Sequence, residues 1–131
     1  MNDKIWRNEI KYVCSGEELV RTEYSICNIC RPDSHGDENG KYRVRSLYFD
    51  DYQDTCFWEN ENGVAPRKKY RIRIYNENAD QIFLECKYKD RDLARKESCR
   101  ITREECEELM QGRCGGLFGQ EPLLRCFCAE M

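Results

Sequence analysis

The run from residue 70 to 89, YRIRIYNENADQIFLECKYK, alternates between apolar and charged side chains on either side of a turn-forming stretch. Side chains of an extended strand point to opposite faces in turn, so each half of the run has an apolar face and a charged face. The apolar positions are Tyr70, Ile72, Ile74, Leu84, Cys86 and Tyr88. The charged positions are Arg71, Arg73, Glu85, Lys87 and Lys89. The pattern predicts a β-hairpin that turns at residues 76–80 and has a mainly cationic face.

Three further segments have the composition of strands. WRNEIKYVC (6–14) alternates well, YRVRSLYFDD (42–51) is rich in β-branched and aromatic residues, and LARKESCRI (93–101) is a weaker fifth strand. We therefore expect an α+β fold built on a mostly antiparallel sheet.

Helix-start signals separate these strands. Ser15 with Glu18 forms a capping box that predicts a helix to about Cys27, and Thr102 with Glu105 predicts a helix that stops at Gly112. A short helix or turn should end at Gly63. The tail 114–131 begins as a loop and is expected to finish as another helix.

Composition limits the classes of protein that fit. The chain has 131 residues, 36% of them charged, and a net charge of −3, which suits one folded domain rather than a disordered chain. Because the net charge is slightly negative, any positive charge must be local. This argues against a protein that coats nucleic acid through an overall basic charge. We find no apolar run of membrane-spanning length and no signal peptide at the N-terminus, so we expect a cytoplasmic protein without a membrane segment.

Ten cysteines need an explanation. Cys14, Cys86 and Cys99 lie in strand-like runs, where they resemble small hydrophobic residues. The pairs in CNIC (27–30) and CFC (126–128) resemble zinc half-sites, but the second has the wrong spacing for a knuckle. Reduced, mostly buried thiols fit the sequence better than a zinc site does.

Basic residues recur on successive strands with little acidic compensation. They are Lys11, Arg71, Arg73, Lys87, Lys89 and Lys96, with only Glu9 and Glu85 among them. A solvated sheet face is the simple interpretation. However, like charges side by side destabilise a sheet, and a bound polyanion such as a phosphate chain would relieve that repulsion.

Several segments resemble, in order, the VTC-type polyphosphate polymerase domain of the triphosphate tunnel metalloenzymes. They are NEIKYVCSGEE, YRVRSLYFDD, RKKYRIRIY and FLECKYKDRDLARKES, followed by the T-x-x-E helix start. The resemblance runs from Glu9 to about Glu108. It implies that residues 1–131 form a single domain in which antiparallel strands make part of a triphosphate-tunnel β-barrel, with helices packed outside. The chain resembles the N-terminal half of the tunnel, truncated at the C-terminus. We expect either a fragment of a longer domain or a homodimer that completes the barrel.

The resemblance also implies roles for individual residues. Those expected to be catalytic, because they grip the transferring phosphates, are Arg71, Arg73 and Lys87. Those expected to bind the phosphate chain are Lys11, Lys89, Lys96 and Arg45. Glu9 and Glu85 are expected to support a divalent ion, Mg²⁺ or Mn²⁺, or to orient the basic side chains. The chain departs from many relatives at Ser98, where they carry an arginine.

The implied reaction is phosphoryl transfer from ATP to a growing polyphosphate chain, with ATP and inorganic polyphosphate or triphosphate as partners and no nucleic acid.

Other functions remain open. Triphosphate hydrolases and cyclases of the same fold resemble one another in an E-x-E-x-K motif on the first strand. This chain has Arg7 in place of the first glutamate of that motif. A non-catalytic remnant that binds polyphosphate or triphosphate is another candidate. A single-stranded nucleic-acid binder needs aromatic side chains among the basic ones, and Tyr70, Phe83 and Tyr88 match this only in part.

Overall fold

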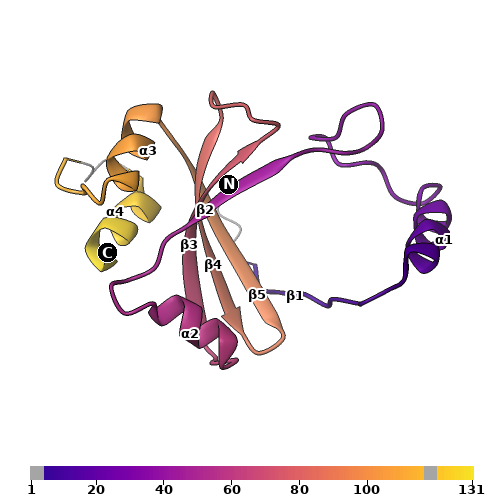
Figure 1. Cartoon of the computed structure of the whole chain (residues 1–131), viewed down its shortest axis with the longest axis horizontal. Helices are drawn as coiled ribbons and strands as arrows, with labels where there is room; N and C mark the ends of the chain where they lie inside the picture. The colour runs from indigo at the N-terminus through magenta and orange to yellow at the C-terminus, as the bar shows by residue number, and fades with distance from the viewer. Residues whose placement is uncertain (1–4, 117–120) are drawn as a thin grey trace.

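The structure is a computed structural model, which describes residues 5–116 and 121–131. Its centre is a five-stranded antiparallel sheet in the order β1-β5-β4-β3-β2 (Figure 1). The strands are β1 (Arg7–Asn8), β2 (Val44–Tyr48), β3 (Arg67–Tyr75), β4 (Ile82–Asp90) and β5 (Leu93–Ile101). The α+β class and the antiparallel sheet are confirmed. Within the described residues the sheet is open, with β1 and β2 as its edges, so a closed tunnel is not seen.

Helices form in each of the segments where the sequence predicts them. They are α1 (Gly16–Ile26), α2 (Thr55–Glu61), α3 (Arg103–Met110) and α4 (Pro122–Glu130). Both predicted capping boxes form, Ser15 with Glu18 and Thr102 with Glu105, because each side chain accepts from a free backbone N–H of the first turn. Gly63 and Gly112 follow α2 and α3 with positive φ, the left-handed conformation that glycine tolerates.

The core lies between one face of the sheet and the helices α3 and α4 (Figure 1). The predicted hairpin forms, since β3 ends at Tyr75 and β4 begins at Ile82. Its apolar face is buried as expected, and Phe127 of α4 packs edge-on against the ring of Tyr70. Residues buried in this core include Ile72, Leu84, Cys86, Ile101, Leu109 and Leu124. The helices α3 and α4 therefore cover one face of the sheet, and the cationic face is the opposite one.

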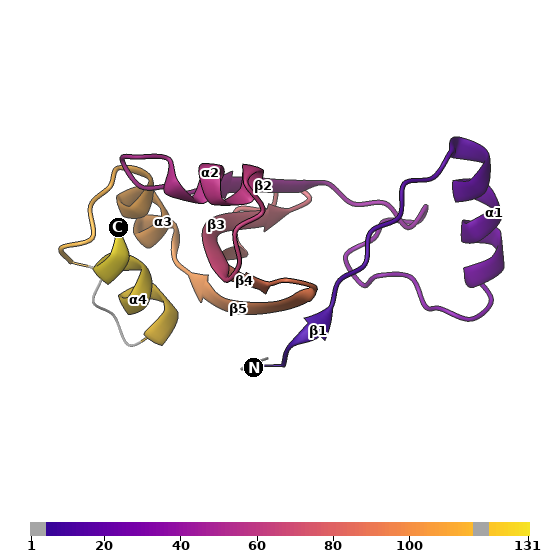
Figure 2. The same cartoon turned by 90° about the horizontal axis from the view of Figure 1, so that it is seen from below.

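The N-terminal strand prediction was wrong in extent. Of the residues 6–14 expected in this strand, only Arg7 and Asn8 pair with β5, at its first two residues, and a last backbone bond joins Glu9 N–H to Asp92 O. Beyond Glu9 the N-terminal segment passes the turn that joins β4 to β5. Residues 10–14 therefore have no residues of β5 left to pair with. The following α1 projects away from the sheet and buries none of its residues (Figure 2). The strand expected over 42–51 is likewise shorter, at Val44–Tyr48.

The cysteine expectation was correct only in part. Cys86 and Cys106 are buried free thiols, but four others are exposed. The exposed ones are Cys14, Cys27, Cys30 and Cys126. Most of these lie on or beside the projecting α1, which has no core to enter.

Residues 1–4, part of the segment considered for a signal peptide, lie outside the described residues, as do residues 117–120 of the expected tail loop. The helix predicted after that loop is α4. None of the helices in the described ranges is both long and apolar enough to traverse a lipid bilayer.

Candidate phosphate-binding face

The cationic face of the sheet results from strand alternation combined with the register between strands. Lys69 on β3 lies directly opposite Lys87 on β4, which lies opposite Lys96 on β5. Directly paired residues of antiparallel strands point to the same side, so these three lysines form one row across the sheet. We call this set the lysine row. Two pairs along, Arg67 lies opposite Lys89 on the same face.

The lysine row is only partly neutralised. Lys87 Nζ lies 2.6 Å from Glu9 Oε2, and Lys96 Nζ lies 3.2 Å from Glu85 Oε1. Lys69 makes no ion pair with the described residues, and its Nζ lies 5.3 Å from the ring centre of Tyr48. Because paired like charges repel across a sheet, the row creates a local positive potential that attracts anions.

Glu85 is the buried acidic centre of this face. Its side chain is 2% exposed, and its Oε2 accepts a 2.7 Å hydrogen bond from Arg71 Nε. Burial alone would raise the pKa of Glu85, but the hydrogen bonds and charges of Arg71 and Lys96 outweigh burial and hold the pKa below its ordinary value. Glu85 therefore stays ionised and fixes the positions of the cations around it.

The two arginines of β3 have defined orientations. Arg71 Nη1 also donates to Tyr48 Oη at 3.0 Å, and Arg73 Nε donates to Ser46 Oγ at 3.0 Å. Both partners come from β2, whose residues Tyr48 and Ser46 pair directly with the arginines. Guanidinium groups held in this way keep further N–H donors available for a bidentate oxyanion.

Glu9 attaches the N-terminal segment to this face. Its hydrogen bond with Lys87 is the main reason that the pKa of Glu9 is lowered. Lys11 Nζ lies 3.7 Å from the same carboxylate. This contact brings Lys11 to the rim of a small cationic pocket of about 70 Å³ between the N-terminal segment, α2 and the sheet. The pocket is lined by Lys11, Cys56, Asn60, Arg67, Lys68, Lys69, Lys87 and Lys89.

The two glutamates expected to support a metal or to orient the basic side chains are both paired with cations. A divalent ion needs oxygen donors, and Mg²⁺ commonly takes one or two carboxylates together with substrate phosphates. The Glu85 carboxylate is already held by Arg71 and Lys96, and Glu9 by Lys87. In the described part of the chain, no three His, Cys, Asp or Glu side chains group together as metal ligands. The orienting role is the one that matches the geometry of both glutamates.

Cys56 lines the cationic pocket, whereas Cys86 lies on the opposite, buried face of β4. Burial raises the pKa of each of these thiols to about 11. Their thiols are therefore protonated near neutral pH, and only the thiolate is strongly nucleophilic.

Most of the residues predicted from the sequence lie together, with one exception. The cationic face brings together Arg71, Arg73, Lys87, Lys89, Lys96 and Glu85, with Glu9 and Lys11 at its edge. Arg45 lies on the opposite face, because it pairs directly with the apolar Ile74. It lines an apolar groove with Leu47 and Met110 instead.

Two cationic residues were missed by the sequence reasoning. Arg67 and Lys69 continue the alternation of Arg71 and Arg73 by two further positions toward the start of β3. Following that period of two to the beginning of the strand would have found both.

The fold and the site together define an α+β protein with one sheet face covered by helices and the other lined with arginine and lysine. The chain belongs to the VTC domain family, whose model matches residues 6–121. Membership of this family indicates a function related to polyphosphate. A search of curated proteins finds no match.

Proposed function

We propose that the cationic face binds the phosphate chain of ATP or inorganic polyphosphate and positions it for phosphoryl transfer to a growing polyphosphate chain. The observation that carries the proposal is the lysine row beside a buried, ionised Glu85. A run of phosphates has the negative charge and the length to contact neighbouring rows of cations at once.

Phosphoryl transfer asks mainly for alignment and charge stabilisation, and little for a general base. Arg71 and Arg73 have their orientations set by Glu85, Tyr48 and Ser46, so they suit the transferring phosphoryl group. Lysines are flexible point charges and suit the remainder of the chain. We therefore assign Arg71, Arg73 and Lys87 to the reacting phosphates, and Lys11, Lys69, Lys89 and Lys96 to the bound chain.

A second candidate is binding of the phosphate chain without catalysis. The open sheet favours it, because the described strands do not close around the phosphates. Phosphates on an open face remain in contact with water, which weakens each electrostatic interaction. The two candidates separate in an assay for polyphosphate formation from ATP: product supports transfer, and retained binding without product supports binding alone.

The direct test is a calorimetric titration with tripolyphosphate of the wild type and of Lys69→Ala/Lys89→Ala. Neither lysine makes an ion pair within the described structure, so the fold should survive their removal. We expect affinity to fall by at least roughly tenfold, the equivalent of about 1.4 kcal/mol. Arg45→Ala is the matched control, because it removes one exposed cation from the opposite face.

Two results would contradict the proposal. One is a folded double variant that binds tripolyphosphate as well as Arg45→Ala does. The other is equal binding of tripolyphosphate and a short single-stranded oligonucleotide at the same salt concentration, since this would make the face a general basic patch.

A further inference from the structure

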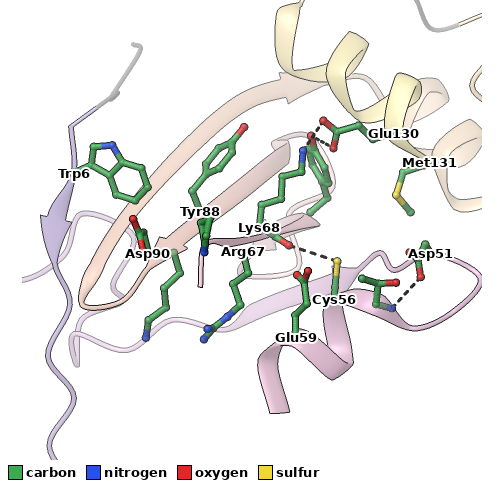
Figure 3. A pocket seen from close by; sticks show the side chains of 14 residues that line it. Trp6, Asp51, Cys56, Glu59, Arg67, Lys68, Tyr88, Asp90, Glu130 and Met131 are labelled. Atoms are coloured by element: carbon green, nitrogen blue, oxygen red, sulfur yellow. Dashed lines mark hydrogen bonds and ion pairs between the residues drawn. The ribbon is translucent and has the colours of Figure 1, made fainter. Parts of the chain in front are cut away.

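A cavity of about 520 Å³ lies on the helix-covered side of the sheet, where β3 begins and β4 ends (Figure 3). Lys68 of β3 pairs directly with Tyr88 of β4, and Tyr70 lies two positions further along β3. Alternation therefore directs all three side chains away from the lysine row. The wall is completed by α2, by the end of α4 and by Trp6 beside β1. The volume is within the range of sites for small organic molecules.

Aromatic rings form a large part of the wall, from Trp6, Tyr70 and Tyr88. Two of these rings already hold a cation, because the guanidinium carbon of Arg95 lies 4.2 Å from the ring centre of Tyr88 and 5.4 Å from that of Trp6. Trp6 remains 42% exposed, so part of its indole is available to a ligand. Ring faces are negative and attract cations, and proteins commonly bind quaternary ammonium groups in this way. The aromatic wall therefore suits an organic cation.

Carboxylates add negative charge beside these rings. Asp51, Glu59 and Asp90 line the cavity, and none of the three has an ion-pair partner among the described residues. Asp51 accepts the backbone N–H groups of Gln53 and Thr55, whereas Glu59 is half-buried and points from α2 towards the sheet (Figure 3). An unpaired carboxylate in a partly enclosed space loses hydration, and a bound cation would offset that cost.

The basic residues that border the cavity leave this negative charge in place. Lys68 Nζ lies 2.6 Å from Glu130 Oε1, so its charge is already compensated. Arg67 and Lys89 occupy the strand positions next to Lys68 and Tyr88, so alternation directs their side chains to the opposite, cationic face. The helix-covered side therefore presents unpaired carboxylates beside aromatic rings.

A metal ion fits this wall less well than an organic cation does. Hard divalent ions take several oxygen ligands, and ring faces offer none. Across residues 5–116 and 121–131, no three His, Cys, Asp or Glu side chains group together as metal ligands.

We propose that this cavity binds a small organic ammonium ion, with its apolar body against Trp6 and Tyr88 and its positive charge near Glu59. The site is separate from the cationic face and takes a ligand of the opposite charge. The protein therefore has a second binding site, which does not depend on the phosphate chain.

The test uses choline and neohexyl alcohol, the neutral molecule in which a carbon atom replaces the ammonium nitrogen of choline. Trp58→Phe leaves Trp6 as the one indole of the chain, so its fluorescence reports on the cavity. We expect choline to change this fluorescence saturably and to bind at least roughly tenfold more tightly than neohexyl alcohol, a difference of about 1.4 kcal/mol. No phosphate is present, so the result is independent of the proposed function.

Glu59→Gln in the same background keeps the size of the side chain and removes its charge. Since Glu59 has no ion pair with the described residues, this variant should fold, and it should lose the preference for choline over the neutral alcohol. Glu61→Gln is the matched control, because Glu61 is exposed on the same helix and is not among the residues that line the cavity.

Three results would overturn the proposal. The first is an unchanged Trp6 fluorescence in the presence of choline. The second is equal affinity for choline and neohexyl alcohol, which would make the cavity merely apolar. The third is a preference for choline that Glu59→Gln retains in full, since the charge of Glu59 would then play no part.

Discussion

At the scale of single residues, Glu85 determines both the stability and the arrangement of the cationic face. It is nearly inaccessible to water and holds Arg71 and Lys96 through separate carboxylate oxygens. Breaking a buried ion pair by neutralising one partner leaves the other charge poorly compensated. The geometry of the cations that we propose as phosphate ligands therefore depends on an acidic residue, which would itself repel a phosphate.

Glu85→Gln should reduce the free energy of unfolding by about 3 kcal/mol, measured by urea denaturation at neutral pH. The control is Glu107→Gln, which removes an exposed pair with Arg103 and should change stability little.

The same variant should alter the pH dependence. The pKa of Glu85 is lowered in the folded state, so its contribution is present above the unfolded-state pKa and disappears as pH falls through the folded-state value. The wild type should therefore lose stability on acidification more steeply than Glu85→Gln. Parallel curves for the two proteins would show that Glu85 does not titrate as described.

Much of the site could be predicted from the sequence, because the period of two places alternate residues on one face. That rule gave Arg71, Arg73, Lys87 and Lys89 correctly as neighbours. It could not place Arg45. Alternation divides the residues of β2 between two faces, but it does not say which of these faces lies on the same side of the sheet as the cationic face. The register of β2 against β3 decides this, and it sets Arg45 beside Ile74.

At the scale of elements, α1 and α3 begin with the same kind of capping box but differ in whether they pack against the core. α3 buries Cys106 and Leu109 against the sheet, whereas α1 buries no residue. A cap contributes to global stability only if its helix unfolds together with the core.

Thr102→Ala should therefore lower the free energy of unfolding by about 1 kcal/mol. Ser15→Ala should leave the global transition unchanged and increase only the amide hydrogen exchange at the start of α1. Equal loss of stability in the two variants would mean that α1 unfolds cooperatively with the sheet.

The elements themselves were largely predictable, since caps and alternation are local signals. The extent of β1 was not, because it depends on how much of β5 is available for pairing. The position of α1 depends on tertiary contacts, which an amphipathic pattern cannot report.

At the scale of the whole molecule, the net charge of −3 conceals a strongly polarised surface. A cluster of its cations lies on one face of an open sheet, which a closed barrel would enclose. Closure by further strands or by a second copy of the chain remains a prediction, because the described sheet ends at β1 and β2.

A ligand that binds only the folded face should stabilise the whole molecule. Tripolyphosphate at about 100 times its Kd should raise the free energy of unfolding by about 2.7 kcal/mol, seen as a higher melting temperature. Lys69→Ala/Lys89→Ala should show a smaller rise at the same concentration. A rise of equal size in both proteins would indicate that the anion acts elsewhere.

The lysine row also sets a limit on how this protein can be engineered. Three cations paired across neighbouring strands repel one another, and the fold tolerates this repulsion without a ligand. Exchanging Lys69 for a neutral residue is therefore expected to raise the stability of the sheet. A search for heat-resistant variants would favour such exchanges and would remove the proposed binding surface with them. Thermostabilisation should therefore be confined to the helix-covered side, where packing can be improved without removing the charges that we propose bind the ligand.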